Sequence, residues 1–465
     1  MKKETGSDIR RNPYNREYQN RSGYAGNTIE RNGQLRREVP KNTRAKEESG
    51  FKKWLSRWFI KTGTLDATFL ILVLILLCIG SIMMFSASYT SSYYKHGGDA
   101  LWFFKRQIIF AAVGIAGMLF VSRINYQKLN SGLAILGYGL SVMLLIVTFI
   151  VNLLNPNKDS DFKRWLDLGF IKFQPSEIAK FGLILFLAYN IARQYGMIQS
   201  KRLPQTPFLR GVDDVFTSKI RASFYKNAST TSMALTIWYA LIITLICGLV
   251  IIENHLSGTI LVFLLGICMM WLGGVKKGYF IILAILVAVV VVVVIKKPDI
   301  LPDYAEQRIV AWLDKDYDPL GARWQTNQSI RAIASGGPFG LGLGNSRQKH
   351  MYVSEPQNDF IFAIVCEELG FVGAAAIIGL FVALVWRAFK IAGKARDVFG
   401  SVLAMGIALQ VGIQVFLNIA VVTDTFPNTG ISLPFFSYGG SSLIMLLCEM
   451  GIILSVSRKS SILKT

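Results

Sequence analysis

The stretch that decides the fold is ATFLILVLILLCIGSIMMFSA, residues 67–87, which has no charged side chain. About 20 consecutive apolar residues are enough for one helix to cross the hydrocarbon core of a bilayer. Similar runs recur along the chain, which is 52% hydrophobic and only 17% charged, too apolar for an ordinary soluble protein. In lipid each run must satisfy its own backbone hydrogen bonds, so all should be helices. The sequence therefore predicts an all-α integral membrane protein with ten transmembrane helices, at residues 67–87, 107–122, 132–153, 177–193, 234–252, 257–273, 278–295, 359–385, 399–422 and 437–456.

The distribution of positive charge indicates how this ten-helix membrane domain, residues 66–458, is oriented. The formal charge of +21 is concentrated in residues 1–65, where sixteen Lys and Arg lie among polar residues without an apolar pattern. This tail is predicted to be disordered and cytoplasmic. The 194–233 loop is also basic, and the short tail at 459–465 follows Arg458, so both termini are expected inside. We interpret the long tail as a topology signal attracted to anionic membrane lipid, and expect no nucleic-acid partner.

The predicted outer connections, at 154–176, 296–358 and 423–436, do not resemble ordinary polar turns. They contain compact blocks of Gly, Pro, aromatic and charged residues. The large loop at 296–358, between the seventh and eighth helices, carries eight Lys and Arg, against the positive-inside trend. Either an anionic ligand or the loop's own acids would account for this charge.

The first block is FKRWLDLGFIKFQPSEIAK, residues 162–180. Pro175 suits the first turn of a helix, and Gln174 or Ser176 can cap it. Glu177 and Lys180 then lie three residues apart on one helix face. Two interpretations stay open: an ion pair that only neutralises two charges, or a functional pair inside the membrane.

The second block, residues 327–370, contains GPFGLGLG followed by three acids around the eighth span. The glycines lack the Lys-Ser/Thr of a nucleotide-binding loop, so we interpret them as tight turns with accessible amides. Asp359 is predicted to enter the span, with Glu367 and Glu368 about two turns deeper. Such a helix needs a polar interior face.

The third block, residues 418–443, interrupts a helix at membrane depth with two prolines and several glycines. Irregular backbone at that depth is tolerated only where it lines a cavity or is buried in protein. Glu449 lies farther along the last span and needs a partner inside the bundle. The three blocks are therefore expected to converge on one polar cavity at the outer leaflet. The three histidines match no metal motif and are interpreted as lone polar-surface residues: His96, His255 and His350.

The stretch DKDYDPLGARWQ, residues 314–325, places an aspartate at every second position. A calcium loop with ligands at positions 1, 3 and 5 also needs Gly at position 6 and Glu at position 12. Here those positions are Pro319 and Gln325, which excludes that interpretation. Asp-Pro followed by Gly321 favours a turn that holds Asp318 in a fixed pose.

Several of these motifs resemble one known family. QPSEIAK (174–180), DPLGARWQ (318–325), GLGLGNSRQK (340–349), NDFIFAIVCEELGFVG (358–373) and LPFFSYGGSS (433–442) look like the signatures of the SEDS proteins, the shape, elongation, division and sporulation family. The resemblance implies a peptidoglycan glycosyltransferase in the bacterial cytoplasmic membrane. Such a protein polymerises lipid II, a disaccharide-pentapeptide on undecaprenyl diphosphate, at the outer face. The implied partners are a class B penicillin-binding protein and other divisome proteins.

The resemblance also implies roles for individual residues. The essential acid of the family's D-P-x-G block corresponds to Asp318, which would act as general base. Independently of the resemblance, Asp314 and Asp316 are interpreted as solvated neighbours that help to hold a cation or raise the proton affinity of Asp318. The cation could be a divalent ion such as Mg²⁺ or Mn²⁺, and no other cofactor is expected. Cations that could meet the leaving diphosphate also include Arg331 and Arg347. Candidate substrate-binding residues are Arg164, Trp165, Lys172, Gln174, Glu177, Lys180, Gln325, Lys349, Glu355, Asp359, Ser437 and Gly439.

Departures from the family pattern are confined to loops. SEPQND (354–359) keeps Glu355 and Asp359 but lacks the first proline and the threonine common in relatives. The 418–435 segment resembles the FtsW and SpoVE branch more than RodA, which favours division over elongation and leaves sporulation open. Two rival functions remain: a lipid II flippase that uses the buried charges, or a scaffold that only positions a transpeptidase.

Overall fold

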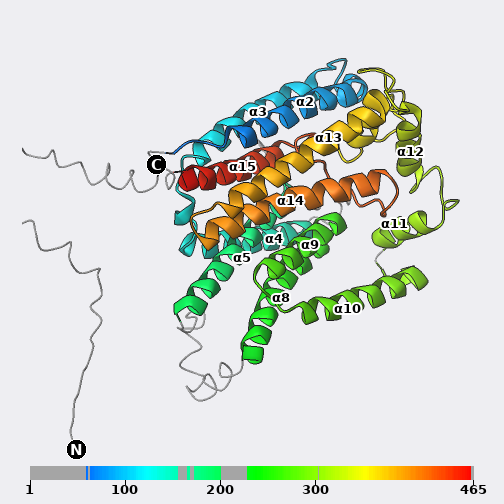
Figure 1. Cartoon of the computed structure of the whole chain (residues 1–465). Coiled ribbons are helices and arrows are strands. Elements are labelled where there is room, and N and C mark those ends of the chain that lie inside the picture. The colour runs from blue at the N-terminus through cyan, green and yellow to red at the C-terminus, as the bar shows by residue number, and fades with distance from the viewer. Residues whose placement is uncertain are drawn as a thin grey trace, which may run out of the picture. The chain divides into compact units, whose positions relative to one another are not determined.

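The computed structural model describes residues 59–60, 63–154, 165–167, 172–200, 228–301 and 303–461. Nearly all of the basic tail at 1–65 and most of the 194–233 loop lie outside these residues. The described part is built from long helices, and each of the ten predicted spans overlaps one of them over most of its length (Figure 1). These helices are α2 (Ala67–Lys95), α3 (Trp102–Val121), α4 (Gly132–Leu154), α5 (Pro175–Ser200), α8 (Ala228–Ile252), α9 (Leu256–Leu272), α10 (Lys277–Lys296), α13 (Ile361–Gly393), α14 (Val398–Val422) and α15 (Gly440–Ser461).

Eight of these helices are long and apolar enough to cross a membrane, so the all-helical membrane architecture is confirmed. The other two are α9, which is apolar but has 17 residues, and α5, which carries Glu177 and Lys180. Several helix ends differ from the prediction: α3 ends at Val121, α9 ends at Leu272 and α15 begins at Gly440, each inside the predicted span. Helix α13 begins at Ile361, so Asp359 precedes it, and α15 runs to Ser461, beyond the predicted end of the membrane domain.

Short elements fill the connections. Helices α11 (Asp303–Leu313) and α12 (Trp324–Gly336) and the 3-10 turn η3 (Pro298–Ile300) belong to the 296–358 loop, and η1 (Tyr126–Lys128) joins α3 to α4. Strands β1 (Leu166–Asp167) and β2 (Lys172–Phe173) form an antiparallel pair with Leu166 opposite Phe173. This small pair was not predicted, because two-residue strands leave no periodic pattern in the sequence.

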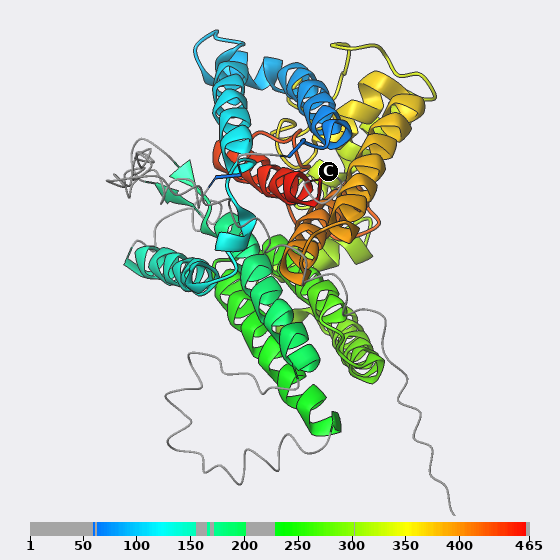
Figure 2. The same cartoon turned by 60° about the vertical axis from the view of Figure 1, so that its left-hand side comes forward.

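Helices α14 and α15 bury most of their residues and form the centre of the bundle. Helix α3 packs along α15, α13 packs between α14 and α2, and α5 joins α4 to α14 (Figures 1 and 2). Helix α10 is different, because no residue of it is buried within the chain. Its Ile and Val side chains therefore face outward, as expected of a helix surrounded by lipid.

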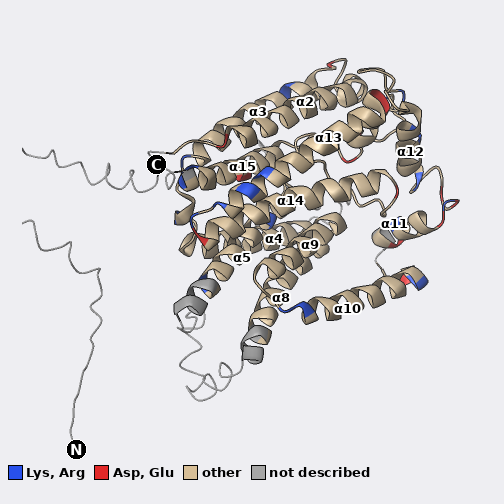
Figure 3. Ribbon diagram, in the orientation of Figure 1, with Lys and Arg blue, Asp and Glu red and all other residues tan. Residues whose placement is uncertain are grey.

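Charged residues gather at helix ends and in the connecting segments (Figure 3). At the end of the bundle where α2 begins, Asp66 accepts the Phe69 N–H at 3.0 Å and pairs with Arg387 of α13, with Nη2 to Oδ2 at 2.8 Å. Asp397 caps α14 and accepts the Tyr126 hydroxyl at 2.9 Å. These contacts connect the helix ends on the side of the bundle that the charge pattern predicts to be cytoplasmic.

Candidate functional site

Asp318 is exposed and lies in a tight turn between α11 and α12. Its φ is +42°, in the left-handed region that Asp tolerates better than most residues. Oδ1 accepts the Gly321 N–H at 3.0 Å, and Oδ2 accepts the Ala322 N–H at 2.8 Å. Two backbone amides thus orient the carboxylate while its outer side faces solvent. The predicted turn around Asp318 is confirmed.

Asp314 and Asp316 do not join this carboxylate. Asp314 Oδ1 accepts the Asp316 N–H at 3.0 Å, and both residues are exposed. Within the described residues no three Asp, Glu, His or Cys side chains converge as a metal site would require. The alternating aspartates therefore do not form a preformed metal centre in this part of the chain.

A buried arginine fastens the Asp318 turn to the bundle. Arg323 lies at the start of α12, and its Nη2 is 2.6 Å from Oδ2 of Asp424, which lies two residues beyond the end of α14. Arg323 also donates to the Ala311 carbonyl of α11, and Trp312 Nε1 donates to the Asp424 carbonyl at 3.2 Å. The same residue thus ties both loop helices to α14. It was not among the predicted site residues, although it lies within DPLGARWQ.

The Asp318 turn also contacts the segment before α13. Trp324 Nε1 donates to the Tyr352 carbonyl and Gln325 Nε2 to the Ser354 carbonyl, both at 2.8 Å. Asn428, from the segment between α14 and α15, donates to Gln325 Oε1 at 3.4 Å. Two of the three predicted outer blocks therefore meet at the first turn of α12.

Two buried carboxylates organise the glycine-rich segment. Glu367 accepts the Ser346 hydroxyl, the Ser335 hydroxyl at 3.3 Å, and the Arg347 N–H at 2.9 Å. Neighbouring Glu368 accepts the Ser86 hydroxyl of α2 at 2.7 Å. The polar interior face predicted for this helix is confirmed, and its partner is the 345–349 segment.

Lys349 belongs to the same buried group of residues. Its Nζ is 3.0 Å from Glu368 Oε1, 2.6 Å from the Gly344 carbonyl and 3.1 Å from Ser86 Oγ, and the residue is 4% exposed. All three contacts are internal to the protein. This placement indicates that Lys349 holds the loop together, whereas the exposed Arg331 and Arg347 remain accessible to a ligand.

The residues predicted around Asp359 lie close together. The Asp359 carbonyl accepts from Asn418 Nδ2 at 2.8 Å, and Ser437 Oγ donates to the Asn358 carbonyl at 2.7 Å. Exposed Glu355 pairs with Lys95 at 3.1 Å. Gly439 is buried, and its carbonyl accepts the Ser442 hydroxyl. These contacts join the chain before α13 to that before α15.

Two residues of the first predicted block belong to a series of buried polar contacts that connects three helices, α5, α14 and α15. Glu177 and Lys180 of α5 pair at 2.9 Å, and Lys180 lies 3.4 Å from Gln414 Oε1 of α14. Gln410, one turn away on α14, donates to Glu449 of α15 at 2.8 Å. The predicted pairing is confirmed, and Glu449 has the interior partner that it was expected to need.

Gln174 and Ser176 do not contribute the predicted helix cap. Their side chains lie 3.4 and 3.3 Å from Nδ1 of His255, between α8 and α9. The prediction of a surface position is wrong for His255, which is 8% exposed, because α5 covers it. Elsewhere in this block, Trp165 is partly buried and Lys172 lies in β2, while Arg164 is outside the described residues.

Glu253, immediately after α8, was not predicted to be unusual. It is 2% exposed, and neither carboxylate oxygen has a hydrogen-bond partner in the described part of the chain. Burial raises the pKa of the Glu253 carboxyl from 4.5 to about 8. Because the folded state then holds this proton more tightly than the unfolded state, the free energy of unfolding falls as pH rises between these two values.

Glu253→Gln is therefore expected to remove this pH-dependent destabilisation. Thermal unfolding of the purified protein in detergent should show the variant more stable than wild type at about pH 9, with a smaller difference at about pH 5. The reason is that glutamine has the same shape and carries no charge to bury. Equal pH profiles for the two proteins would contradict the inferred burial of Glu253.

Comparison with known proteins agrees with this arrangement. The family model for FtsW, RodA and SpoVE, described as a cell cycle protein, matches residues 66–462. The chain belongs to the FtsW/RodA/SpoVE family. The match begins at Asp66, which caps α2, and includes all ten long helices of the bundle.

Individual members of the FtsW/RodA/SpoVE family are similar over most of their length. Stage V sporulation protein E of Bacillus subtilis is 36% identical over 402 residues, covering 85% of this chain and 97% of the relative. A probable peptidoglycan glycosyltransferase FtsW of Trichlorobacter lovleyi is 35% identical, covering 84% and 93%.

Solved structures share the fold of this chain. A chain from the structure "Structural coordination of polymerization and crosslinking by a peptidoglycan synthase complex" is 26% identical, with a TM-score of 0.63 over 85% of this chain and 98% of the other. RodA of Thermus thermophilus matches with a TM-score of 0.57 at 24% identity, over 85% of this chain and 97% of RodA.

Proposed function

We propose that this chain is a peptidoglycan glycosyltransferase that polymerises lipid II at the outer face of the bacterial cytoplasmic membrane. Its ten long helices would all cross the membrane, with both termini in the cytoplasm. The observation that carries the proposal is the exposed Asp318 carboxylate, oriented by two amides and fastened to the bundle through Arg323. The names of the FtsW relatives support the reaction class.

In this reaction Asp318 would act as general base. The acceptor sugar's hydroxyl oxygen forms a bond to the anomeric carbon of the donor, and the bond from that carbon to the diphosphate oxygen breaks. The hydroxyl proton passes to the free side of the Asp318 carboxylate, and the lipid diphosphate departs with the bonding electrons. Because the donor already carries its leaving group, no nucleotide is needed.

Cations that contact the substrate would stabilise the charge that develops on the diphosphate. Arg331 on α12 and Arg347 in the glycine-rich segment are both exposed, so their guanidinium groups can reach a ligand. Arginine suits this role because its planar group binds two phosphate oxygens at once. Lys172 and Arg164 of the first block remain candidates for the same role.

We further propose that a class B penicillin-binding protein binds this chain and cross-links the strands that it makes. The support is the structural relative from a synthase complex that couples polymerization and crosslinking. Relatives named FtsW and stage V sporulation protein E favour division or sporulation over elongation. Other divisome proteins would then be neighbours in the cell.

The glycine three residues after Asp318 offers a specific test of this geometry. A Cβ added at Gly321 would lie 2.1 Å from Asp318 Oδ2. Gly321→Ala should therefore turn the carboxylate away from its two amides and slow polymerisation by about 10-fold or more, with little change in thermal stability. Gly379→Ala is the matched control, since a Cβ there meets nothing within 4 Å. Full activity in Gly321→Ala would show that the carboxylate's pose is unimportant.

The function itself is tested with purified protein and labelled lipid II, with and without a cross-linking partner. Glycan strands are expected from the protein alone or in the complex. A flippase would instead move lipid II across liposome membranes, depend on the buried Glu177–Lys180 pair and make no strands. A scaffold would neither make strands nor transport lipid II. Transport without strands, or the absence of both activities, would overturn the proposed reaction.

A further inference from the structure

The 427–439 segment between α14 and α15 has no regular secondary structure, yet most of it is buried. Ile431, Leu433 and Phe436 are at most 6% exposed. The φ of Phe435 is +66°, a left-handed conformation that bulky residues keep only where their surroundings fix it. A buried backbone without a helix or strand must also find its hydrogen-bond partners in neighbouring elements. The side chains that supply these partners therefore determine where the segment lies.

Two amide side chains of α14 hold this segment. Gln414 Nε2 donates to the carbonyl of Ser432 at 3.0 Å and to its hydroxyl oxygen at 3.1 Å. One turn farther along α14, Asn418 Nδ2 donates to the Ile431 carbonyl at 2.6 Å and to the Asp359 carbonyl at 2.8 Å. Both amide side chains are buried, so these hydrogen bonds are shielded from water.

Gln414 makes one contact that Asn418 lacks. Lys180 Nζ of α5 donates to Gln414 Oε1 at 3.4 Å, and the same ammonium group pairs with Glu177 at 2.9 Å. Asn418 Oδ1, in contrast, has no hydrogen-bond partner in the described part of the chain. A carboxamide can serve both sides because its oxygen accepts while its NH₂ group donates. Gln414 therefore joins a buried ion pair of α5 to the 427–439 segment.

The same segment reaches the proposed catalytic region. Ser437 Oγ donates to the Asn358 carbonyl at 2.7 Å, just before α13. Asn428 Nδ2 donates to Oε1 of Gln325 at 3.4 Å, in the first turn of α12. A shift of the segment would therefore be transmitted both to the chain before α13 and to the turn that carries Asp318.

We propose that Gln414 is a positioning residue that couples the Glu177–Lys180 pair to the 427–439 segment. Lys180 orients the carboxamide, the carboxamide holds the segment, and the segment supports the Asp318 turn. The ion pair then affects polymerisation without contact between Lys180 and lipid II. This effect on the reaction rests on the proposed function, whereas the effect on the segment does not.

The coupling is tested by hydrogen–deuterium exchange of the backbone amides in 427–439, measured on the full-length protein in detergent. The variant Glu177→Gln/Lys180→Met replaces the ion pair by neutral side chains, so no buried charge is left unpaired. Without the ammonium group, the carboxamide of Gln414 can turn away from Ser432. Exchange in the segment should become about 10-fold faster, which corresponds to the loss of about one hydrogen bond. Unchanged exchange would overturn the coupling.

Gln414→Leu should accelerate exchange to a similar extent. Adding it to the neutral-pair variant should give no further increase, because both changes break the same series of contacts. Asn418→Leu is the matched comparison: it removes hydrogen bonds to the same segment without touching Lys180, so its effect should add to that of the neutral-pair variant. Additive effects of Gln414→Leu, or non-additive effects of both leucine variants, would contradict a specific link through Gln414.

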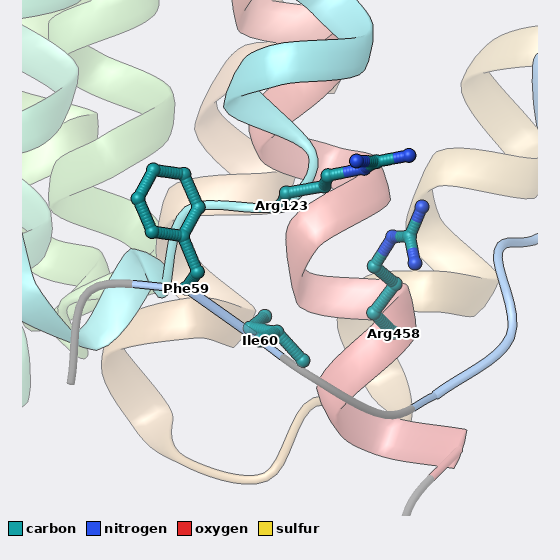
Figure 4. Close-up of a pocket in the computed structure, with 4 residues that line it drawn as sticks. All are labelled: Phe59, Ile60, Arg123 and Arg458. Atoms are coloured by element: carbon teal, nitrogen blue, oxygen red, sulfur yellow. The ribbon is translucent and has the colours of Figure 1, made fainter. Parts of the chain in front are cut away.

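Two further variants serve as controls. Arg123→Gln removes a cation that lies two residues beyond the end of α3, in a pocket with Phe59, Ile60 and Arg458 (Figure 4). It should leave exchange in 427–439 unchanged; acceleration equal to that of the neutral-pair variant would reduce the effect to lost charge and overturn the proposal. Gln414→Glu keeps an acceptor without the two donors, guards against misfolding of Gln414→Leu and should match its exchange. Wild-type protection in Gln414→Glu would contradict the role of the donors.

Polymerisation kinetics separate positioning from substrate contact. The neutral-pair variant and Gln414→Leu should each lower kcat by about 10-fold and keep the KM for lipid II within about two-fold of wild type. A raised KM in the neutral-pair variant, with unchanged exchange, would assign Lys180 to substrate binding and overturn the proposal. If the wild-type protein makes no strands, the proposed function fails, while the exchange measurement still decides the coupling.

Discussion

Asp318→Asn is expected to slow polymerisation of lipid II by about 10²–10⁴-fold, the usual contribution of a general base. Asparagine fills the same space and can still accept the Gly321 N–H, so the turn should persist. Its amide cannot take a proton from the acceptor hydroxyl. Initial rates with labelled lipid II measure the loss, and thermal unfolding in the same detergent checks that the fold survives.

The control for this substitution is Asp316→Asn. Asp316 is exposed and lies two residues away from Asp318. The Gly321 and Ala322 N–H groups donate to the Asp318 carboxylate and not to Asp316. It should keep polymerisation within about two-fold of wild type, because it neither orients nor accepts the transferred proton. Equal losses in the two variants would mean that the charge of the whole loop matters and that no single base is distinguished.

Glu367→Ala is expected to have the largest effect on the fold of the 296–358 loop. Its carboxylate accepts two hydroxyls and the Arg347 and Gln348 N–H groups. Each buried donor left without an acceptor costs about 1–3 kcal/mol. The free energy of unfolding should therefore fall by about 3 kcal/mol or more, which a denaturation curve in detergent would measure.

Activity should fall with Glu367→Ala as well, because the segment that Glu367 anchors leads to Tyr352 and Ser354, whose carbonyls hold the first turn of α12. Protease cleavage between 345 and 354 should become faster in the variant. Glu367→Gln keeps one acceptor oxygen and should lie between wild type and alanine in both measurements. Unchanged cleavage and stability in Glu367→Ala would refute this positioning role.

The sequence predicted those features that depend on neighbouring residues. Each apolar run is long enough to specify a helix on its own, so all ten helices could be located. The Glu177–Lys180 pair also follows from local spacing, since residues three apart share a helix face. The turn at Asp318 is coded by Asp, Pro and Gly within four positions.

Features that depend on distant segments could not be predicted in this way. Arg323 and Asp424 are 101 residues apart, and only the packing of the loop helices on α14 brings them together. Lys349 appears in the sequence as one more loop cation, yet Glu368 and Ser86 enclose it. His255 was assigned to the surface because nothing in its own neighbourhood indicates that α5 covers it.

Chemical rescue of Asp318→Ala tests the central claim most directly. The purified variant is given labelled lipid II with and without formate, whose carboxylate can enter the space that the missing side chain leaves at this exposed position. Asp318 as general base predicts no strands without formate and strand formation that increases with formate concentration. Strands formed at the wild-type rate without formate would contradict it.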